Sequence, residues 1–401
     1  MHCSFRLVVE SRHPDNHWKT LFSNGAYRQI FPFDMILRRI VSERIILDNT
    51  AHFGYTTHEI LFSHVRKDMK QVNHQNVLVT GGTGLVGSHL VELLLRRGYP
   101  VTCLVRDPAR IRWLEGLDVR LIPGDCLLPG SLDSAVKEVS LVFHVAGLTK
   151  AKRAKEYYEV NHLGTKNILE SCARSNPGIR KFVLVSSLAA AGPSGDGRPV
   201  RDTDRPRPVS DYGRSKLLAE EETLRYKDRF PVVILRPSAV YGPRDTDMYE
   251  LFRWASKGLW IELAGGDRFI NPCYVADLAA AMLLAAEKQT ASGSIYFVAE
   301  NRSYSWSEFR QALLSSGGVK ARTITVPCWA AYFMGLVSEF GSVFRSRPAL
   351  TNRQKVREGV QRYWTCDLTK IENELGFRAA FSLEKGLKLT WEWYRKQGWI
   401  A

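Results

Sequence analysis

The stretch from Asn76 to Val105 constrains the fold of this 401-residue chain more than any other. Apolar residues 76–79 precede a glycine-rich segment, 80–87, and the spacing of apolar residues then predicts a helix over 88–97 and a second strand over 101–105. Glycines let a backbone reverse sharply and approach a pyrophosphate, whose charge is stabilised by free N–H groups at the start of a helix. Because the glycines lie between a strand and a helix, the stretch predicts a dinucleotide-binding unit rather than an ordinary glycine-rich turn.

The residue at the end of the second strand distinguishes the two nicotinamide dinucleotides. An acidic residue there would hydrogen-bond the ribose 2′-hydroxyl of NAD. This chain has Val105 followed by Arg106, and a guanidinium binds a 2′-phosphate in a bidentate manner. The sequence therefore favours NADP(H). NAD(H) is the alternative, if Arg106 lies on a solvated loop and Asp107 serves the ribose.

Composition restricts the classes of partner. The formal net charge is +15, which suits an anionic ligand, but the basic residues are scattered and no nucleic-acid-binding motif occurs. The seven cysteines form no C-x-x-C pair, so we expect reduced thiols in a cytoplasmic protein and no metal site.

Residues 1–75 differ from the rest of the chain. Seven of the ten histidines fall here, and neither helical nor strand periodicity persists. No apolar segment follows a basic start, so no secretory signal peptide is predicted. We expect a poorly ordered extension, with a partner-binding or organelle-targeting segment as the alternative.

From residue 76 onward, predicted strands and helices alternate regularly. Further strands are predicted at 119–122, 141–145, 182–185, 232–235 and 294–298. The helices predicted among them include 132–139 and 156–175, and a later one is predicted over 305–314 behind a possible cap. This alternation indicates an α/β protein with a doubly wound parallel sheet and right-handed crossovers. We expect a dinucleotide-binding domain over 76–240. Residues 241–401 would form a smaller, mostly helical substrate-binding region, with some strands and helices returning to the core.

The chemistry is expected at the carboxyl ends of the strands, where ligands of such sheets bind. Asp125, the pair Ala146-Gly147 and Ser187 all follow predicted strands. Tyr212 and Lys216 lie four residues apart on one helix face, and a cation beside a phenol lowers the pKa of the phenol. Such a pair is also common on solvated helices. Behind a dinucleotide turn and a strand-end serine, it indicates a general acid/base.

Together these motifs resemble the NAD-dependent epimerase/dehydratase family, the extended short-chain dehydrogenases/reductases. The resemblance runs from about residue 76 to the end. The run from Val105 to Pro108 is similar to the dihydroflavonol-reductase-like and sterol-dehydrogenase-like branch. The segments that carry the resemblance are 80–87, Gly124-Asp125, 144–147, Val160-Asn161 with Gly164-Thr165, Ser186-Ser187, 212–216, 236–243 and 271–277.

The resemblance implies a Rossmann-type sheet and a role for each matching residue. Tyr212 would be the catalytic acid/base, Lys216 would lower its pKa and hold the nicotinamide ribose, and Ser187 would polarise the substrate carbonyl. The implied cofactor-binding residues are Gly81, Thr83, Gly84, Leu85, Val86, Gly87, Arg106, Asp125, Cys126, Ala146, Gly147, Asn161, Tyr212, Lys216, Pro237 and Ser238. Relatives of this kind are usually homodimers formed through paired helices.

Three functions follow as hypotheses. The first is an NADP(H)-dependent reductase or dehydrogenase acting on a hydroxyl/ketone pair of an apolar molecule. The aromatic stretch 326–344, too short for a membrane-spanning helix, would then be a packed helix or a lid over the substrate. The second is an NAD-dependent nucleotide-sugar epimerase or dehydratase, against which the valine at position 105 argues. The third is a non-catalytic NADP-binding sensor, which would not need a tuned phenol.

Overall fold

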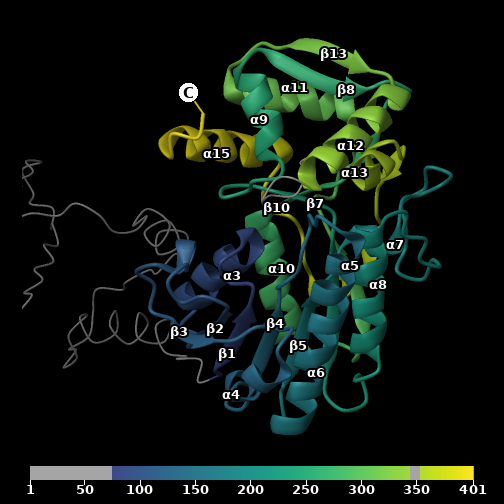
Figure 1. Cartoon of the computed structure of the whole chain (residues 1–401). Helices are drawn as coiled ribbons and strands as arrows, with labels where there is room; N and C mark the ends of the chain where they lie inside the picture. Colours follow the sequence, from purple (N-terminus) through teal and green to yellow (C-terminus); the bar gives the residue numbers. More distant parts are fainter. Residues whose placement is uncertain (1–74, 344–352, 401) are drawn as a thin grey trace, which may run out of the picture. The chain divides into compact units, whose positions relative to one another are not determined.

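A seven-stranded parallel sheet forms the centre of the fold (Figure 1). The computed structural model describes residues 75–343 and 353–400, all of which fall in one compact unit. The strands lie in the order β11 (Ser294–Val298), β6 (Val232–Pro237), β5 (Lys181–Val185), β4 (Leu141–His144), β1 (Val77–Thr80), β2 (Val101–Val105) and β3 (Arg120–Pro123). The strand order reverses between β1 and β4, which is where doubly wound sheets bind ligands. The predicted fold class is confirmed.

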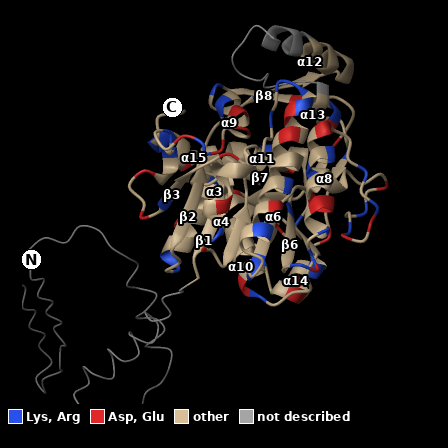
Figure 2. Cartoon of the chain, turned by 60° about the horizontal axis from the view of Figure 1, so that its bottom comes forward, with Lys and Arg blue, Asp and Glu red and all other residues tan. Residues whose placement is uncertain are grey.

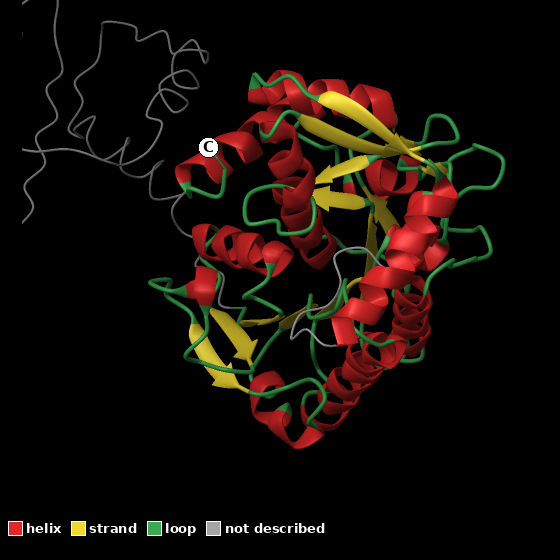
Figure 3. Ribbon diagram, turned by 45° about the horizontal axis from the view of Figure 1, so that its top comes forward, coloured by secondary structure: helices red, strands yellow, loops and turns green. Residues whose placement is uncertain are grey.

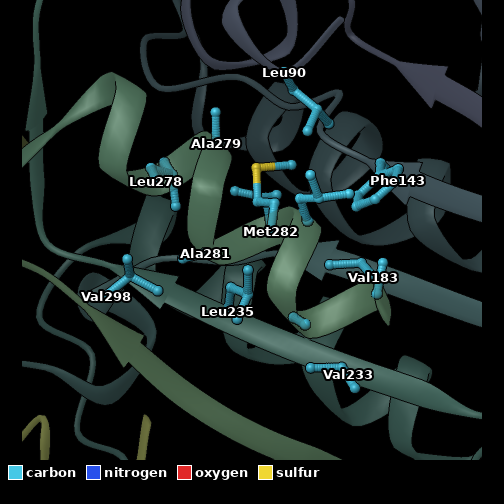
Figure 4. Packing of buried hydrophobic residues seen from close by; sticks show 14 of the residues in the cluster. Leu90, Phe143, Val183, Val233, Leu235, Leu278, Ala279, Ala281, Met282 and Val298 are labelled. Atoms are coloured by element: carbon cyan, nitrogen blue, oxygen red, sulfur yellow. The ribbon is translucent and has the colours of Figure 1, made fainter. Parts of the chain in front are cut away.

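Helices cover both faces of this sheet (Figure 3). Val77 and Val79 face one side and pack with α3 (Leu85–Arg96) and α10 (Val275–Glu287), as the labelled Leu90 and Met282 show in Figure 4. Leu78 faces the other side and packs with α4 (Asp133–Val136), α6 (Gly164–Ser175) and α8 (Asp211–Leu224). Burial on both faces explains why these strands are continuous apolar runs.

The region that follows β6 builds a third hydrophobic cluster, around Trp260, Phe309 and Trp391. Its helices are α9 (Tyr249–Ser256), α11 (Trp306–Gly317), α12 (Cys328–Val343), α13 (Arg353–Gly359), α14 (Thr369–Leu375) and α15 (Leu383–Lys396). Its strands are β7 (Ala239–Tyr241), β8 (Leu259–Leu263), β9 (Phe269–Ile270), β10 (Pro272–Tyr274), β12 (Tyr304–Ser305), β13 (Arg322–Val326) and β14 (Tyr363–Trp364). Helix α10 and strand β11 return to the large sheet.

Two predicted helices differ in detail from the observed ones. The helix expected over 132–139 is hydrogen-bonded only over the four residues of α4, although Leu132 and Val139 are both buried as the apolar spacing requires. The long helix expected over 156–175 consists of α5 (Ala154–Tyr157), a π-helical segment (Tyr158–Leu163) and α6. The predictions for residues 1–74 lie outside the described residues.

Helix α12 carries the most exposed apolar surface in the described part of the chain. Trp329 and Phe333 are 75% and 62% exposed, and no charged residue occurs from Cys328 to Leu336, which are tan in Figure 2. Within the described residues, no helix combines the length and the apolar character needed to cross a membrane.

Candidate active site

The glycine turn after β1 has the shape that the sequence predicted. Gly81 has φ +72°, and a Cβ atom there would lie 2.7 Å from the backbone nitrogen of Ala146 at the end of β4. A Cβ atom on Gly87 would lie 2.2 Å from the carbonyl oxygen of Gly81. Only glycine fits at these two positions, so the turn packs directly against β4 and the first turn of α3.

The start of α3 leaves its backbone donors available. Gly84 is the N-cap and provides no side-chain hydrogen bond, and the first helical bond runs from the N–H of Ser88 to the carbonyl of Gly84. The N–H groups of Leu85, Val86 and Gly87 therefore lack helical partners. Thr83 is half-buried beside them. This arrangement fits a pyrophosphate.

Arg106, Asp125 and Cys126 meet beyond the ends of β2 and β3. Arg106 is exposed, and although its charge lowers the pKa of Cys126, burial raises that pKa to about 12. The carboxylate of Asp125 accepts a hydrogen bond from the N–H of Leu127 at 2.9 Å. These side chains surround the place where an adenosine would lie if the glycine turn holds its pyrophosphate.

A buried polar chain supports the loop after β4. The hydroxyl of Thr80 lies 2.8 Å from Nδ1 of His144, and Nε2 of His144 lies 3.0 Å from the hydroxyl of Thr165. Thr165 in turn donates to the carbonyl of Asn161 at 2.6 Å. Burial lowers the pKa of His144 to about 3, so its imidazole is neutral at physiological pH.

Asn161 connects the loop after β4 to the helix that carries the candidate acid/base. Its side chain accepts from the N–H of Leu148 at 2.8 Å and donates to the hydroxyl of Ser215 at 2.9 Å. It lies in the π-helical segment, a feature frequent at functional sites. A Cβ atom on Gly147 would lie 3.0 Å from Oδ1 of Asn161 and 3.1 Å from Nζ of Lys216, so these three residues meet.

The structure brings together Ser187, Tyr212 and Lys216. Ser187 follows β5, N-caps α7 (Leu188–Ala191) and lies close enough to the phenol of Tyr212 for its hydroxyl to lower the pKa of that phenol. Lys216 is 6% exposed and donates to the carbonyl of Val185 at 2.9 Å. A Cβ atom on Gly213 would lie 2.3 Å from the carbonyl oxygen of Ala189, so glycine lets α8 approach α7 closely enough for this contact.

The electrostatic surroundings of Tyr212 include three residues that sequence reasoning missed, namely Lys355, Glu358 and Asp247. Burial raises the pKa of Tyr212, while the hydroxyl of Ser187 and the ammonium of Lys355 lower it. Glu358 and Asp247 act in the opposite direction. Lys355 and Glu358 lie on α13, more than 140 residues after Tyr212, and no motif or spacing marked them. Burial lowers the pKa of Lys216 to about 8. The effect of Lys216 on the pKa of Tyr212 stays a prediction.

Behind the site, a buried ion pair joins β6 to α8. The guanidinium of Arg236 binds both carboxylate oxygens of Glu220 at 2.9 and 2.6 Å, and the hydroxyl of Ser186 donates to the same carboxylate. Pro237 is buried next to this pair. The hydroxyl of Ser238 is buried without a hydrogen-bond partner, as expected of an atom that contacts a ligand. The turn, the free N–H groups and this hydroxyl fit a nicotinamide dinucleotide. In the described ranges, no group of three or more His, Cys, Asp or Glu residues could hold a metal ion.

Comparisons with known proteins agree with this geometry. The family model for the "NAD dependent epimerase/dehydratase family" matches residues 77–299. A ceramide reductase of Caulobacter vibrioides is 31% identical over 326 residues, covering 81% of this chain and 96% of that protein. The human sterol-4-alpha-carboxylate 3-dehydrogenase, decarboxylating, is 26% identical over 352 residues, covering 82% of this chain and 92% of that protein.

A solved structure extends the similarity to a cofactor complex. The UDP-glucose 4-epimerase of Thermus thermophilus, in complex with NAD, has a TM-score of 0.66 and 26% identity, covering 80% of this chain and 99% of that one. Relatives named as reductases, dehydrogenases and epimerases make this protein an NAD(P)-dependent oxidoreductase. The chain belongs to the NAD dependent epimerase/dehydratase family, the extended short-chain dehydrogenases/reductases.

Proposed function

We propose that this protein is an NADP(H)-dependent reductase or dehydrogenase that interconverts a ketone and a secondary alcohol on an apolar molecule. The observation that carries the proposal is the contact of Ser187 with Tyr212, on a helix that also presents Lys216 to the end of β5. A hydroxyl and a phenol that lie close together can both hydrogen-bond to a single substrate oxygen.

In this proposal Tyr212 moves the proton. A bound nicotinamide dinucleotide supplies the hydride to the carbonyl carbon, or accepts it in the reverse direction. The phenol of Tyr212 donates its proton to the carbonyl oxygen as the alcohol forms. The hydroxyl of Ser187 polarises the same oxygen. Lys216 binds the nicotinamide ribose, and its positive charge favours the phenolate form of Tyr212.

The preference for NADP(H) rests on Arg106. The position before it is Val105 rather than an acidic residue, so no carboxylate repels a 2′-phosphate there. Arg106 is exposed and close enough to Cys126, next to Asp125, to lower the pKa of that thiol. A guanidinium in this place can bind a 2′-phosphate through two parallel hydrogen bonds.

The apolar class of substrate is supported by α12 and by two relatives. Helix α12 exposes Trp329 and Phe333 and packs against α13, which contacts Tyr212 through Lys355. The relative in Caulobacter vibrioides is named a ceramide reductase, and the human one is named for a sterol carboxylate. An apolar ketone therefore comes first in a substrate screen.

Titration of NADPH and NADH into the full chain, followed by nicotinamide fluorescence, tests the cofactor preference. Arg106→Ala removes a charge-assisted pair, so we expect NADPH affinity to fall roughly ten- to a hundredfold while NADH affinity stays unchanged. Arg110→Ala is the matched control, because this exposed guanidinium already pairs with Asp107 at 3.4 Å. Equal loss in both variants, or stronger binding of NADH by the wild type, would contradict the role of Arg106.

A second candidate is an NAD-dependent nucleotide-sugar epimerase, favoured by the similarity to the epimerase–NAD complex. An epimerase returns the hydride to its product, so it retains its cofactor through the cycle. NAD that stays with the protein through dialysis, together with turnover of UDP-sugars, would favour this candidate. A non-catalytic sensor is the third possibility. It requires that Tyr212→Phe leave every measured activity unchanged.

A further inference from the structure

We propose that Lys355 on α13 is a second positioning cation for Tyr212, which stabilises the phenolate form of this residue and thereby sets the pH range of catalysis. The inference rests on the proposed acid/base role of Tyr212. It concerns a residue outside the motifs of the dinucleotide-binding domain.

Helix α13 is joined to the start of α8 by three hydrogen bonds between four residues. The N–H of Asp211 donates to Gln354 at 2.8 Å, and the amide of Gln354 donates back to the carboxylate of Asp211 at 2.7 Å. The hydroxyl of Ser210, the N-cap of α8, donates to Glu358 at 2.6 Å. These contacts hold α13 next to Tyr212, which follows Asp211 in α8.

The resulting geometry places the ammonium of Lys355 against the phenol. Its Nζ lies 5.6 Å from the centroid of the Tyr212 ring and 3.0 Å from a carboxylate oxygen of Glu358. The ring of Tyr157 lies 5.9 Å from that of Tyr212, and the charge of Lys355 acts on the pKa of Tyr157 as well. An opposite charge at this range favours the ionised form of a group.

The charged groups around Tyr212 come from three parts of the fold. Lys216 lies on α8 itself, Lys355 and Glu358 lie on α13, and Asp247 follows β7 and pairs with Lys150 at 2.6 Å. The two lysines differ in their electrostatic state. Burial lowers the pKa of Lys216 to about 8, whereas Glu358 raises the pKa of Lys355 above its ordinary value. Lys355 therefore keeps its charge at pH values where Lys216 loses it.

The effect on the reaction follows from the proton balance. In alcohol oxidation the phenolate of Tyr212 removes the hydroxyl proton while a hydride leaves the carbon for NADP⁺, giving ketone, NADPH and a neutral phenol. In reduction both transfers reverse, and solvent protonates the phenolate afterwards. Stabilising the phenolate raises the fraction of enzyme competent for oxidation at a pH below the pKa of Tyr212.

The test compares full-length wild type, Lys355→Met and Lys355→Arg. For the methionine variant we expect the acidic limb of the pH profile of kcat for oxidation to move up by about one unit. The rate on that limb would fall roughly tenfold, with recovery at higher pH. The arginine variant retains the charge and should keep the wild-type profile. Gln354→Ala, which removes hydrogen bonds from α13 but no charge, controls for loss of docking.

A second measurement does not depend on turnover. Tyrosine labelled with ¹³C at Cζ allows the ionisation of Tyr212 to be followed by NMR, with the signal assigned from Tyr212→Phe. A higher pKa of Tyr212 in Lys355→Met than in wild type supports the inference, even if no ketone or alcohol is turned over and the proposed function fails. An unchanged pKa, or equal profiles for the methionine and arginine variants in an active enzyme, would overturn the inference and leave the proposed function standing.

Discussion

Gly213 fixes the distance between the phenol of Tyr212 and Ser187. Because a Cβ atom at this position would lie 2.3 Å from the carbonyl oxygen of Ala189, Gly213→Ala must push α8 away from α7. A displacement of the order of 1 Å costs about a hundredfold in rate, so we expect that loss in kcat with a nearly unchanged far-UV circular dichroism spectrum. Gly178→Ala is the control, because no heavy atom lies within 4 Å of a Cβ atom there. Full activity in Gly213→Ala would contradict this account.

His144 makes the stability of the protein depend on pH. Its pKa is about 3 in the folded state, below the ordinary value of 6.5, so the unfolded state binds more protons between these values. As pH falls below 6.5, His144 destabilises the fold by about 1.4 kcal/mol per pH unit, down to a pH of about 3. Urea unfolding at pH 7 and pH 5 should therefore show a smaller decrease for His144→Asn than for wild type, by about 2 kcal/mol. Equal decreases would mean that groups other than His144 cause the pH dependence of the free energy of unfolding.

Sequence analysis singled out residues whose spacing along the chain indicates their chemistry. Tyr212 and Lys216 share a helix face, and Ser187 follows a predicted strand, so local pattern was sufficient to bring them together. Lys355 has no such pattern. It reaches Tyr212 only because Gln354 and Glu358 bind residues 210 and 211, which is a consequence of tertiary packing.

At the scale of elements, the π-helical segment holds the loop after β4 in place. Asn161→Ala would leave the N–H and carbonyl of Leu148 without their partner, and each unsatisfied buried group costs about 1–3 kcal/mol. We expect weaker binding of the dinucleotide as well as a lower melting temperature. Asn176→Ala is a matched control, because Asn176 donates two hydrogen bonds to the carbonyls of Val136 and Val139 outside the site. It should lower stability and leave cofactor affinity unchanged.

The predictability of the elements follows their length and their burial. Strands β1, β2, β4, β5 and β6 and helices α3 and α8 were predicted because buried apolar runs and helical spacing extend over four or more residues. Strands β8 and β13 have five residues each but are mostly not buried, and they were missed. Strands β9, β12 and β14 have two residues each, too few for any periodicity, and were missed. The helix at 305–314 was expected behind a possible cap, and Ser305 forms a capping box with Glu308 at the start of α11.

For the whole molecule, the region expected over 241–401 includes elements that complete the core of the large sheet. Helix α10 covers one face of the large sheet, and β11 pairs with β6 along its edge. We predict that a fragment of residues 67–240 lacks fixed tertiary structure, because Phe143, Val183 and Leu235 would lose the side chains that cover them. Near-UV circular dichroism and gel filtration, compared with residues 67–401, would measure this. A monomeric fragment with a native-like spectrum would contradict the prediction.

The fastening of α13 to α8 has a consequence for how the chain reaches its native state. Asp211 and Gln354 are 143 residues apart, so their contact closes a long loop. Because closing a long loop costs conformational entropy, we expect this contact to form late in folding. During refolding from denaturant, helical signal should therefore recover before enzyme activity does. During synthesis on a ribosome, Lys355 can reach the phenol of Tyr212 only after α13 has been made, 143 residues after the start of α8.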